Sequence, residues 1–115
     1  MYRAEFSTFI KEDIKEIHAY IKDTLEAPRA ADKLRDDLLE RIEYIKMNPY
    51  ARPLVQDKFL AYLGLRSIKV NNYLLFYIVK ENKDKSKSYI NILRFMYGRR
   101  DWANIIKNES INEIL

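Results

Sequence analysis

The sequence predicts an α+β domain: an antiparallel helical hairpin packed on a small antiparallel β-sheet, with a short C-terminal helix. Three observations predict this class. Two N-terminal segments carry apolar residues at helical spacing, two later apolar segments are joined by the turn Asn71-Asn72, and a third follows a charged loop. Helices followed by a run of strands are typical of layered α+β folds.

The first element expected is a short strand at Tyr2–Phe6, where apolar and polar residues alternate. Ser7 or Thr8 can then cap a helix, because Ser and Thr side chains accept hydrogen bonds from the first free backbone N–H groups. Apolar residues recur along this helix at steps of three or four and form one stripe. The stripe consists of Ile10, Ile14, Ile17, Ile21 and Leu25.

A second helix of similar length is predicted to begin at Pro28 and to end at Asn48-Pro49. Two such helices with a short break between them pack as an antiparallel hairpin. Each apolar stripe is too wide to be covered by the other helix alone, so we expect both helices to cover a sheet face as well. The stripe of the second helix consists of Ala31, Leu34, Leu38, Ile42 and Ile45.

The sheet is expected in the second half of the chain. After an irregular stretch, Phe59–Tyr62 is expected to pair at the sheet edge. Asn tolerates the positive φ of a tight turn, so Asn71-Asn72 predicts a hairpin between Leu65–Val70 and Tyr73–Val79. The second of these strands lacks alternation, which indicates a central strand covered on both faces. Tyr89–Tyr97 is the third strand of this group, after a charged loop.

The chain leaves the third strand through Gly98-Arg99-Arg100-Asp101-Trp102. A short helix is expected at Asp101–Ile106, with its apolar side chains turned inward. We expect one domain over residues 1–115, with a core of about residues 2–106 and a tail, 107–115, that is loose unless a partner holds it.

Composition narrows the classes of function. The chain has 115 residues, no cysteine and one histidine, so it lacks the ligands of disulfides, thiolate sites and histidine-based metal centres. No apolar run is long enough for a membrane span, and the N-terminus lacks the apolar core of a signal peptide. We therefore expect no metal, no cofactor, no membrane contact and a cytoplasmic location. The net charge of +4 favours an anionic partner, either a nucleic acid or an acidic protein.

An ordered set of short segments over about residues 2–106 resembles the RelE/ParE toxin superfamily, whose members are toxins of type II toxin–antitoxin pairs. The resemblance implies a RelE/ParE-like fold and neutralisation by a cognate acidic, partly disordered antitoxin. RelE-like members cut messenger RNA on the ribosome without a metal, whereas ParE-like members inhibit DNA gyrase without catalysis. The segments that carry the resemblance are Pro28 with Ala30-Ala31, Asn48-Pro49, Gly64-Leu65-Arg66, Asn72–Tyr77 and Arg94–Asp101.

For the RelE-like activity, the resemblance assigns catalytic roles to Arg66, Tyr97 and Arg100. RNA cleavage without a metal needs a base, an acid and cations on the phosphate, and arginine suits the last task because its planar fork binds phosphate in a bidentate manner. Each residue also has a structural alternative. Arg66 could pair with Asp57 or a helix carboxylate, Arg100 with Asp101, and Tyr97 could be a core aromatic.

Lys58, Arg94 and Arg99 are expected to bind substrate phosphates. Strict alternation along Tyr89–Tyr97 would place Tyr97 with Leu93 and Phe95, and Arg94 on the opposite face, unless a bulge intervenes. Arg94 is therefore the weaker candidate.

The chain also departs from the nuclease pattern. Met96 stands where YoeB-type toxins have histidine, and Ile106 stands where RelE has tyrosine. The lysine pair of RelE is reduced to Lys58. A tyrosine or lysine base would need a strongly lowered pKa, because the ordinary values are about 10 and about 10.4.

Three hypotheses follow from the sequence. A ribosome-dependent mRNA endonuclease is favoured slightly, because Arg66, Tyr97 and Arg100 each match a functional position of the nuclease branch. The alternatives are a DNA gyrase inhibitor without catalytic activity and a degenerate family member that only binds an antitoxin.

Overall fold

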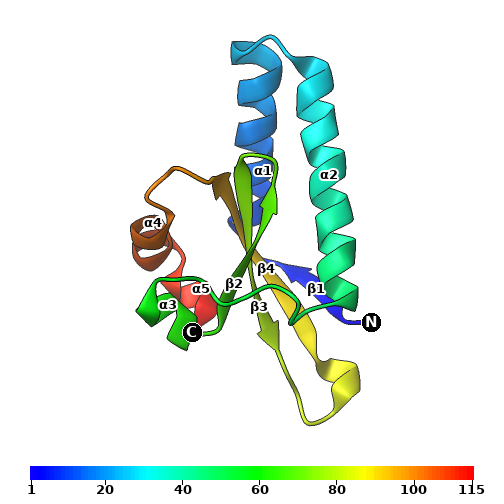
Figure 1. Cartoon of the computed structure of the whole chain (residues 1–115), viewed down its shortest axis with the longest axis vertical. Coiled ribbons are helices and arrows are strands. Elements are labelled where there is room, and N and C mark those ends of the chain that lie inside the picture. Colours follow the sequence, from blue (N-terminus) through cyan, green and yellow to red (C-terminus); the bar gives the residue numbers. More distant parts are fainter.

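Four strands form one sheet in the order β1-β4-β3-β2 in the computed structural model, which describes residues 1–115 (Figure 1). β2 (Leu65–Val70), β3 (Tyr73–Lys80) and β4 (Tyr89–Tyr97) are antiparallel, as predicted. β1 (Arg3–Phe6) pairs with β4 in parallel, which alternation alone did not indicate. Parallel pairing is possible because a long helical connection separates β1 from the other strands.

The predicted helical hairpin is confirmed. α1 (Ile10–Ala19) continues as a short π-helix, η1 (Tyr20–Thr24), and α2 (Pro28–Met47) returns beside it. Pro28 occupies the first turn of α2, where its fixed φ is already helical and no N–H is needed. The hairpin extends beyond the sheet, so the molecule is elongated (Figure 1).

Of the two residues predicted to cap the first helix, Ser7 does so. Its Oγ accepts hydrogen bonds from the backbone N–H groups of Phe9 and Ile10, both at 3.2 Å. The same hydroxyl donates to the carbonyl oxygen of Leu93 in β4, at 2.6 Å. One buried side chain therefore both starts the helix and joins it to the sheet. Thr8 instead donates to the carboxylate of Glu113.

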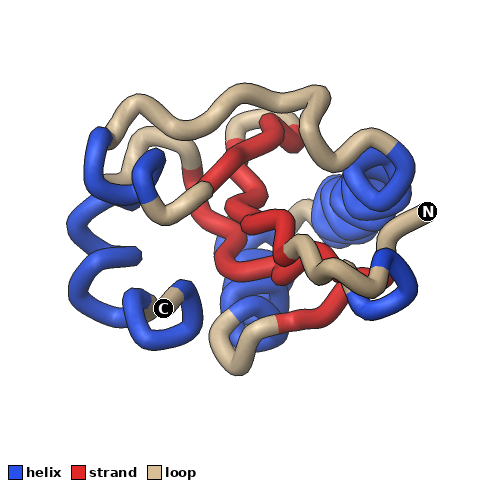
Figure 2. Tube along the Cα trace, turned by 90° about the horizontal axis from the view of Figure 1, so that it is seen from below, coloured by secondary structure: helices blue, strands red, loops and turns tan.

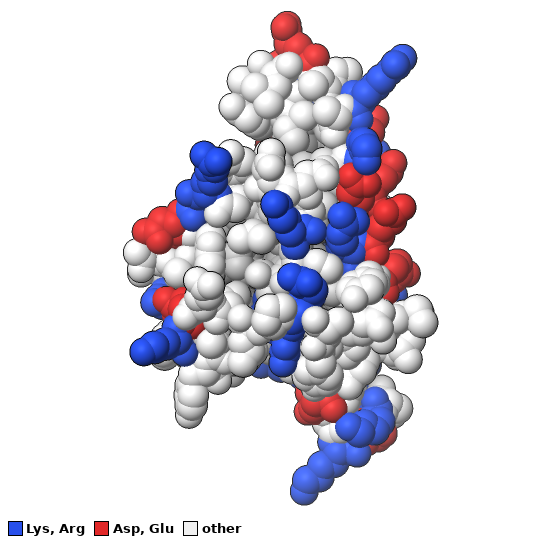
Figure 3. All heavy atoms as spheres, viewed as in Figure 1, with Lys and Arg blue, Asp and Glu red and all other residues white.

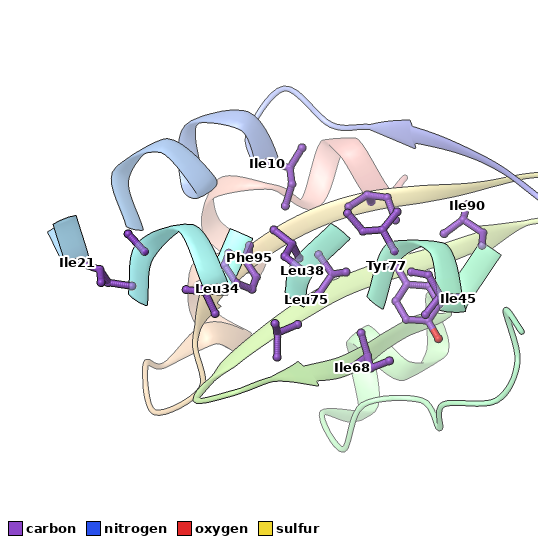
Figure 4. Packing of buried hydrophobic residues seen from close by; sticks show 14 residues of the cluster. Ile10, Ile21, Leu34, Leu38, Ile45, Ile68, Leu75, Tyr77, Ile90 and Phe95 are labelled. Carbon is purple, nitrogen blue, oxygen red and sulfur yellow. The ribbon is translucent and has the colours of Figure 1, made fainter. Parts of the chain in front are cut away.

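One core cluster lies between the hairpin and the sheet (Figure 4). All five residues of the predicted stripe of the second helix are buried, which confirms the register of α2. The stripe of the first helix is only partly covered: Ile10 and Ile21 are buried, whereas Leu25 is 54% exposed near the tip of the hairpin. From the sheet, the cluster receives Ile68, Val70, Leu75, Tyr77, Ile90, Ile92 and Phe95.

Three short helices cover the opposite face of the sheet, so that the strands lie between two helical layers (Figure 2). They are α3 (Lys58–Tyr62), α4 (Trp102–Glu109) and α5 (Ile111–Ile114). The expectation that Phe59–Tyr62 pairs at the sheet edge is wrong, because this segment belongs to α3. The side chain of Asp57 starts that helix by accepting a hydrogen bond from the backbone N–H of Leu60 at 2.9 Å.

The C-terminal residues are ordered, contrary to the expectation of a loose tail at 107–115. Ser110 and Ile114 are buried, and Ile114 belongs to the second core cluster. Lys80 and Asn91 donate hydrogen bonds from β3 and β4 to the carbonyl oxygens of Ile114 and Glu113. The physical reason is the apolar second face of the sheet, which would be exposed to water without this cover.

The β2–β3 turn is formed as predicted, with Asn71 at φ +55°, in the left-handed region that Asn tolerates. No helix combines the length and the apolar character required to cross a bilayer. No three His, Asp or Glu side chains lie close enough together to hold a metal ion.

Candidate functional site

Of the three predicted catalytic residues, Tyr97 and Arg100 line the same groove, whereas Arg66 lies elsewhere on the sheet. Arg66 pairs across the sheet with Tyr77, near one end of β2, whereas Tyr97 pairs with Tyr73 at the other end. Both side chains belong to the sheet face that carries the hairpin, but they are four residues and two strands apart. At about 3.3 Å per residue and about 4.8 Å per strand, their Cα atoms are separated by roughly 16 Å. The two residues therefore do not belong to one compact site.

Tyr97 lies over an open groove beside the β2–β3 turn. Its side chain is 39% exposed and packs edge-on against Tyr73, with ring centroids 5.6 Å apart. Its hydroxyl has no hydrogen-bond partner within the chain. The groove has a volume of about 770 Å³, and its walls include Tyr20, Leu25 and Arg100. We call this mostly apolar space the exit groove.

Arg99 and Arg100 are exposed and form no ion pair. The alternative in which Arg100 pairs with Asp101 does not occur, because the Asp101 carboxylate accepts a hydrogen bond from the side chain of Asn104 at 2.8 Å. Arg100 therefore offers a free guanidinium at the rim of the exit groove.

Arg94 is buried and fully engaged, which contradicts its predicted role in binding phosphate. Its Nε and Nη2 atoms donate to the two carboxylate oxygens of Asp13 at 2.7 and 2.9 Å, and Nη1 donates to Ser110 at 2.6 Å. The guanidinium also lies over the ring of Phe9, 5.0 Å from its centroid. The residue is 5% exposed, so its guanidinium is not accessible to a ligand.

A bulge in β4 overturns the alternation expected from the sequence. Phe76 pairs with Arg94 but Tyr77 pairs with Ile92, so Leu93 is the extra residue. As a result Phe95 shares the hairpin-facing core with Ile90 and Ile92, while Leu93 and Met96 face the C-terminal helices.

Arg66 is half-buried and has no carboxylate partner. The predicted alternative, an ion pair with Asp57, is not formed, because Asp57 pairs with Lys107 at 2.6 Å. Arg66 donates a hydrogen bond to the carbonyl oxygen of Arg52 and lies over the ring of Tyr50, 5.1 Å from its centroid. Its remaining donors are free for an anion.

Lys58 begins α3, is exposed and forms no ion pair. Its charge is available to an anion, but it belongs to a different element from Arg66 and Tyr97.

Further cations, which the sequence analysis did not identify, gather near Arg66. A hollow of about 500 Å³ opens between α2 and β2 and is lined by Glu40, Arg41, Tyr44, Arg52, Ile68 and Lys69. We call it the basic hollow. Figure 3 shows Lys and Arg side chains gathered over the middle of this face. The sequence carries no local signal for the cluster, because its members come from three segments that meet only in the fold.

The tyrosines beside these sites are poor candidates for a general base. Burial raises the pKa of Tyr73, and the nearby Tyr20 and Tyr97 add to the effect. Burial also raises the pKa of Tyr77, against the opposing influence of Arg66 and Arg52. A base acts best with a pKa near the working pH, so both pKa shifts have the wrong direction for proton abstraction.

The sequence matches the family described as the ParE toxin of the type II toxin–antitoxin system parDE over residues 4–102. No curated protein sequence is significantly similar to the chain. Among solved structures, the fold is similar to a chain of the chromosomal ParDE toxin–antitoxin system from P. aeruginosa, with a TM-score of 0.62 and 22% identity. That alignment covers 84% of this chain and 96% of the other. The family match spans most of the sequence, and the chain therefore belongs to the ParE toxin family of type II toxin–antitoxin systems.

Proposed function

We propose that this chain is a toxin that inhibits DNA gyrase by binding it, without cutting RNA, and that a cognate antitoxin neutralises it. The observation that carries the proposal is the separation of Arg66 from Tyr97 and Arg100. Gyrase as the target follows from the resemblance to ParE-like toxins, and the family match supports that branch.

The geometry offers little for phosphoryl chemistry. General acid–base catalysis requires groups within hydrogen-bond reach of the reacting atoms. Arg66 and Tyr97 are separated by roughly 16 Å along the sheet, and the third cation, Arg94, is locked in the core by Asp13. Met96, which stands where YoeB-type toxins have histidine, is buried on the opposite face from Tyr97.

The exit groove instead has the character of a protein-binding surface. Exposed tyrosine and leucine side chains line it, and one free arginine lies at its rim. Protein interfaces are enriched in aromatic residues and arginine. A toxin that acts by contact would need such a surface, and an antitoxin that covered it would silence the toxin.

A second candidate, the ribosome-dependent mRNA endonuclease, is favoured by one observation. Arg66 has no carboxylate partner and adjoins further unpaired cations, as a phosphate-binding arginine would. In that case the ribosome would have to supply the missing acid and base.

Two assays separate the candidates. In a gyrase supercoiling assay, the purified toxin is expected to inhibit the enzyme, and adding the antitoxin should restore supercoiling. Primer extension on RNA from cells after induction is expected to show no toxin-dependent cleavage. RNA breaks together with full gyrase activity would reject the proposal in favour of the endonuclease, and growth unaffected by induction would indicate a degenerate, antitoxin-binding member.

A further inference from the structure

Three cations line the basic hollow, and a fourth, Arg66, adjoins it through its hydrogen bond to Arg52. Arg41 comes from α2, Arg52 from the loop before α3, and Arg66 and Lys69 from β2. None of them has a carboxylate within ion-pair distance. What distinguishes this group from other unpaired cations, such as Lys58 or Arg99, is that its members come together from three segments of the chain.

Backbone contacts hold two of these guanidiniums in place. The Nε of Arg41 donates to the carbonyl oxygen of Lys69 at 3.3 Å, and Nη1 of Arg66 donates to the carbonyl oxygen of Arg52. A guanidinium has five N–H donors, so each keeps most of its donors free. The carbonyl groups are neutral, so they position the two guanidiniums without cancelling their charge. The site is therefore preorganised for an anion.

The lining of the hollow indicates the kind of anion. Only Glu40 opposes the cations, and Ile68 is the only aliphatic residue. The ring of Tyr44 is 46% exposed beside them. An interface for a protein needs a buried apolar or aromatic anchor, and that character belongs to the exit groove. Cations with one exposed aromatic ring suit phosphates joined to planar bases.

We propose that the basic hollow binds the phosphodiester backbone of a nucleic acid. Arg41, Arg52, Arg66 and Lys69 contact phosphate oxygens, with the arginines able to bind in a bidentate manner. The proposal does not depend on cleavage or on gyrase, because Arg41, Arg52 and Arg66 do not line the groove that contains Tyr97. It adds a nucleic-acid contact to the function of the toxin.

The test measures binding of the purified toxin to fluorescein-labelled 12-nucleotide probes by fluorescence anisotropy at several salt concentrations. The variant is Arg41→Ala/Arg52→Ala. Its charge-matched control is Lys11→Ala/Lys15→Ala on α1, where both lysines are exposed and form no ion pair. Single-stranded DNA, single-stranded RNA and duplex DNA serve as separate probes, so that the preferred source of the phosphates is identified.

We expect the Arg41→Ala/Arg52→Ala variant to bind the preferred probe about tenfold more weakly. The slope of log K against log salt should fall by about 1.4–1.8, as two lost phosphate contacts require. The control should change affinity less than about twofold, because distant exposed charges are screened beyond about 10 Å at 0.1 M salt.

Three results would overturn the proposal. They are an equal loss in the lysine control, no binding of any probe at low salt, and an unchanged affinity of the arginine variant. Labelled polyglutamate serves as an acidic peptide probe. If it binds as tightly as the oligonucleotides and depends equally on Arg41 and Arg52, an acidic protein partner would replace nucleic acid as the proposed ligand. None of these results bears on gyrase inhibition, which the supercoiling assay measures separately.

Discussion

At the scale of single residues, partners decide what an arginine does. Arg94 is surrounded by the carboxylate of Asp13, the hydroxyl of Ser110 and the ring of Phe9, so its charge is neutralised inside the protein. Arg66 and Arg100 carry the same guanidinium but have no carboxylate partner, so their charge remains available. The same residue type is thus neutralised inside the fold in one place and left available to a partner in two others.

Asp13→Ala is expected to destabilise the protein strongly. The substitution removes the bidentate partner of the buried Arg94 guanidinium, leaving only Glu109 at 3.6 Å, and removes a hydrogen bond from the backbone N–H of Phe95. Breaking a buried ion pair from one side costs about 3–5 kcal/mol. Urea denaturation measures the change, with Lys33→Ala as the control, since the Lys33 side chain of the pair with Asp37 is 73% exposed. A loss below about 1 kcal/mol, the range of a surface pair, would show that the network contributes little.

Tyr97→Phe is expected to leave both toxicity and the melting temperature nearly unchanged. The substitution removes one oxygen, which has no partner in the chain, and keeps the ring packed on Tyr73. Growth after induction and a thermal melt measure the two properties. Toxicity that disappears while the melting temperature is kept would show that the hydroxyl takes part in chemistry and would revive the endonuclease hypothesis.

At the scale of elements, short polar contacts join α3, which the sequence did not predict, to α4, which it predicted at Asp101–Ile106. Asp57 caps α3 and at the same time pairs with Lys107 of α4, so one carboxylate joins the two elements. The hydrogen bond from Lys107 holds the pKa of this carboxyl below its usual value of about 3.8, and the N–H of Leu60 adds to the effect.

This shift predicts a dependence of stability on pH. Because the pKa is lower in the folded state, Asp57 stabilises the fold fully above about pH 3.8, and the contribution disappears as the pH falls through the folded pKa. Asp57→Asn should therefore lower the melting temperature at pH 7, and the difference from the wild type should shrink in acid. Asparagine still caps a helix, so the ion pair is what changes.

Melting curves of Asp57→Asn and the wild type, recorded from about pH 7 down to about pH 2.5, measure the effect. Asp36→Asn serves as the control, because Asp36 is exposed on α2 and forms no ion pair. A difference that stays constant over the whole pH range would show that the carboxylate charge of Asp57 is not the cause.

The hairpin and the sheet depend on the stripe of α2. Leu38 is 1% exposed at its centre, and its truncation to alanine should cost about 2–5 kcal/mol through lost burial and a cavity. Leu39, the next residue, is 54% exposed, so Leu39→Ala is the matched control and should cost far less. Chemical denaturation of both variants tests which face of α2 is buried. Equal denaturation midpoints for Leu38→Ala and Leu39→Ala would contradict the burial of Leu38.

At the scale of the whole molecule, the elongated fold presents two different surfaces. The chain measures 47 × 29 × 23 Å along its principal axes, with the hairpin extending past the sheet (Figure 1). The exit groove near the hairpin tip is mostly apolar, whereas three of the six residues that line the basic hollow between α2 and β2 are cationic. The separation allows one protein to contact two kinds of partner at once.

The antitoxin is expected to be acidic and to cover the sheet together with the basic segment that follows β4, which contains Arg99 and Arg100. Changing Arg66, Arg99 and Arg100 together to alanine should weaken its binding about tenfold at low salt and less at high salt, because exposed charges are screened. Isothermal titration of the toxin with the antitoxin measures this. The charge-matched control is Lys11→Ala/Lys15→Ala/Lys22→Ala on the first helix, and unchanged affinity of the arginine variant would contradict the expectation.

Much of the fold was predictable because it depends on local periodicity. The stripe of α2, the turn at Asn71 and the bounds of β4 follow from the spacing of apolar residues and from the backbone preferences of Pro and Asn. The helical identity of Phe59–Tyr62 and the order of the C-terminal tail were not predicted. Both depend on the apolar second face of the sheet, which exists only once the strands have paired.

The sequence by itself indicated the RelE/ParE superfamily, the α+β layering and the surplus of positive charge, because periodicity, ordered segments and composition are properties of the chain. Only the tertiary structure decided which cations are free. The bulge at Leu93 broke the alternation of β4, Asp13 neutralised Arg94, and the packing of α2 against β2 brought Arg41 and Arg52 beside Arg66. The physical reason is that electrostatic partners are set by distance in space, and these residues lie far apart along the chain.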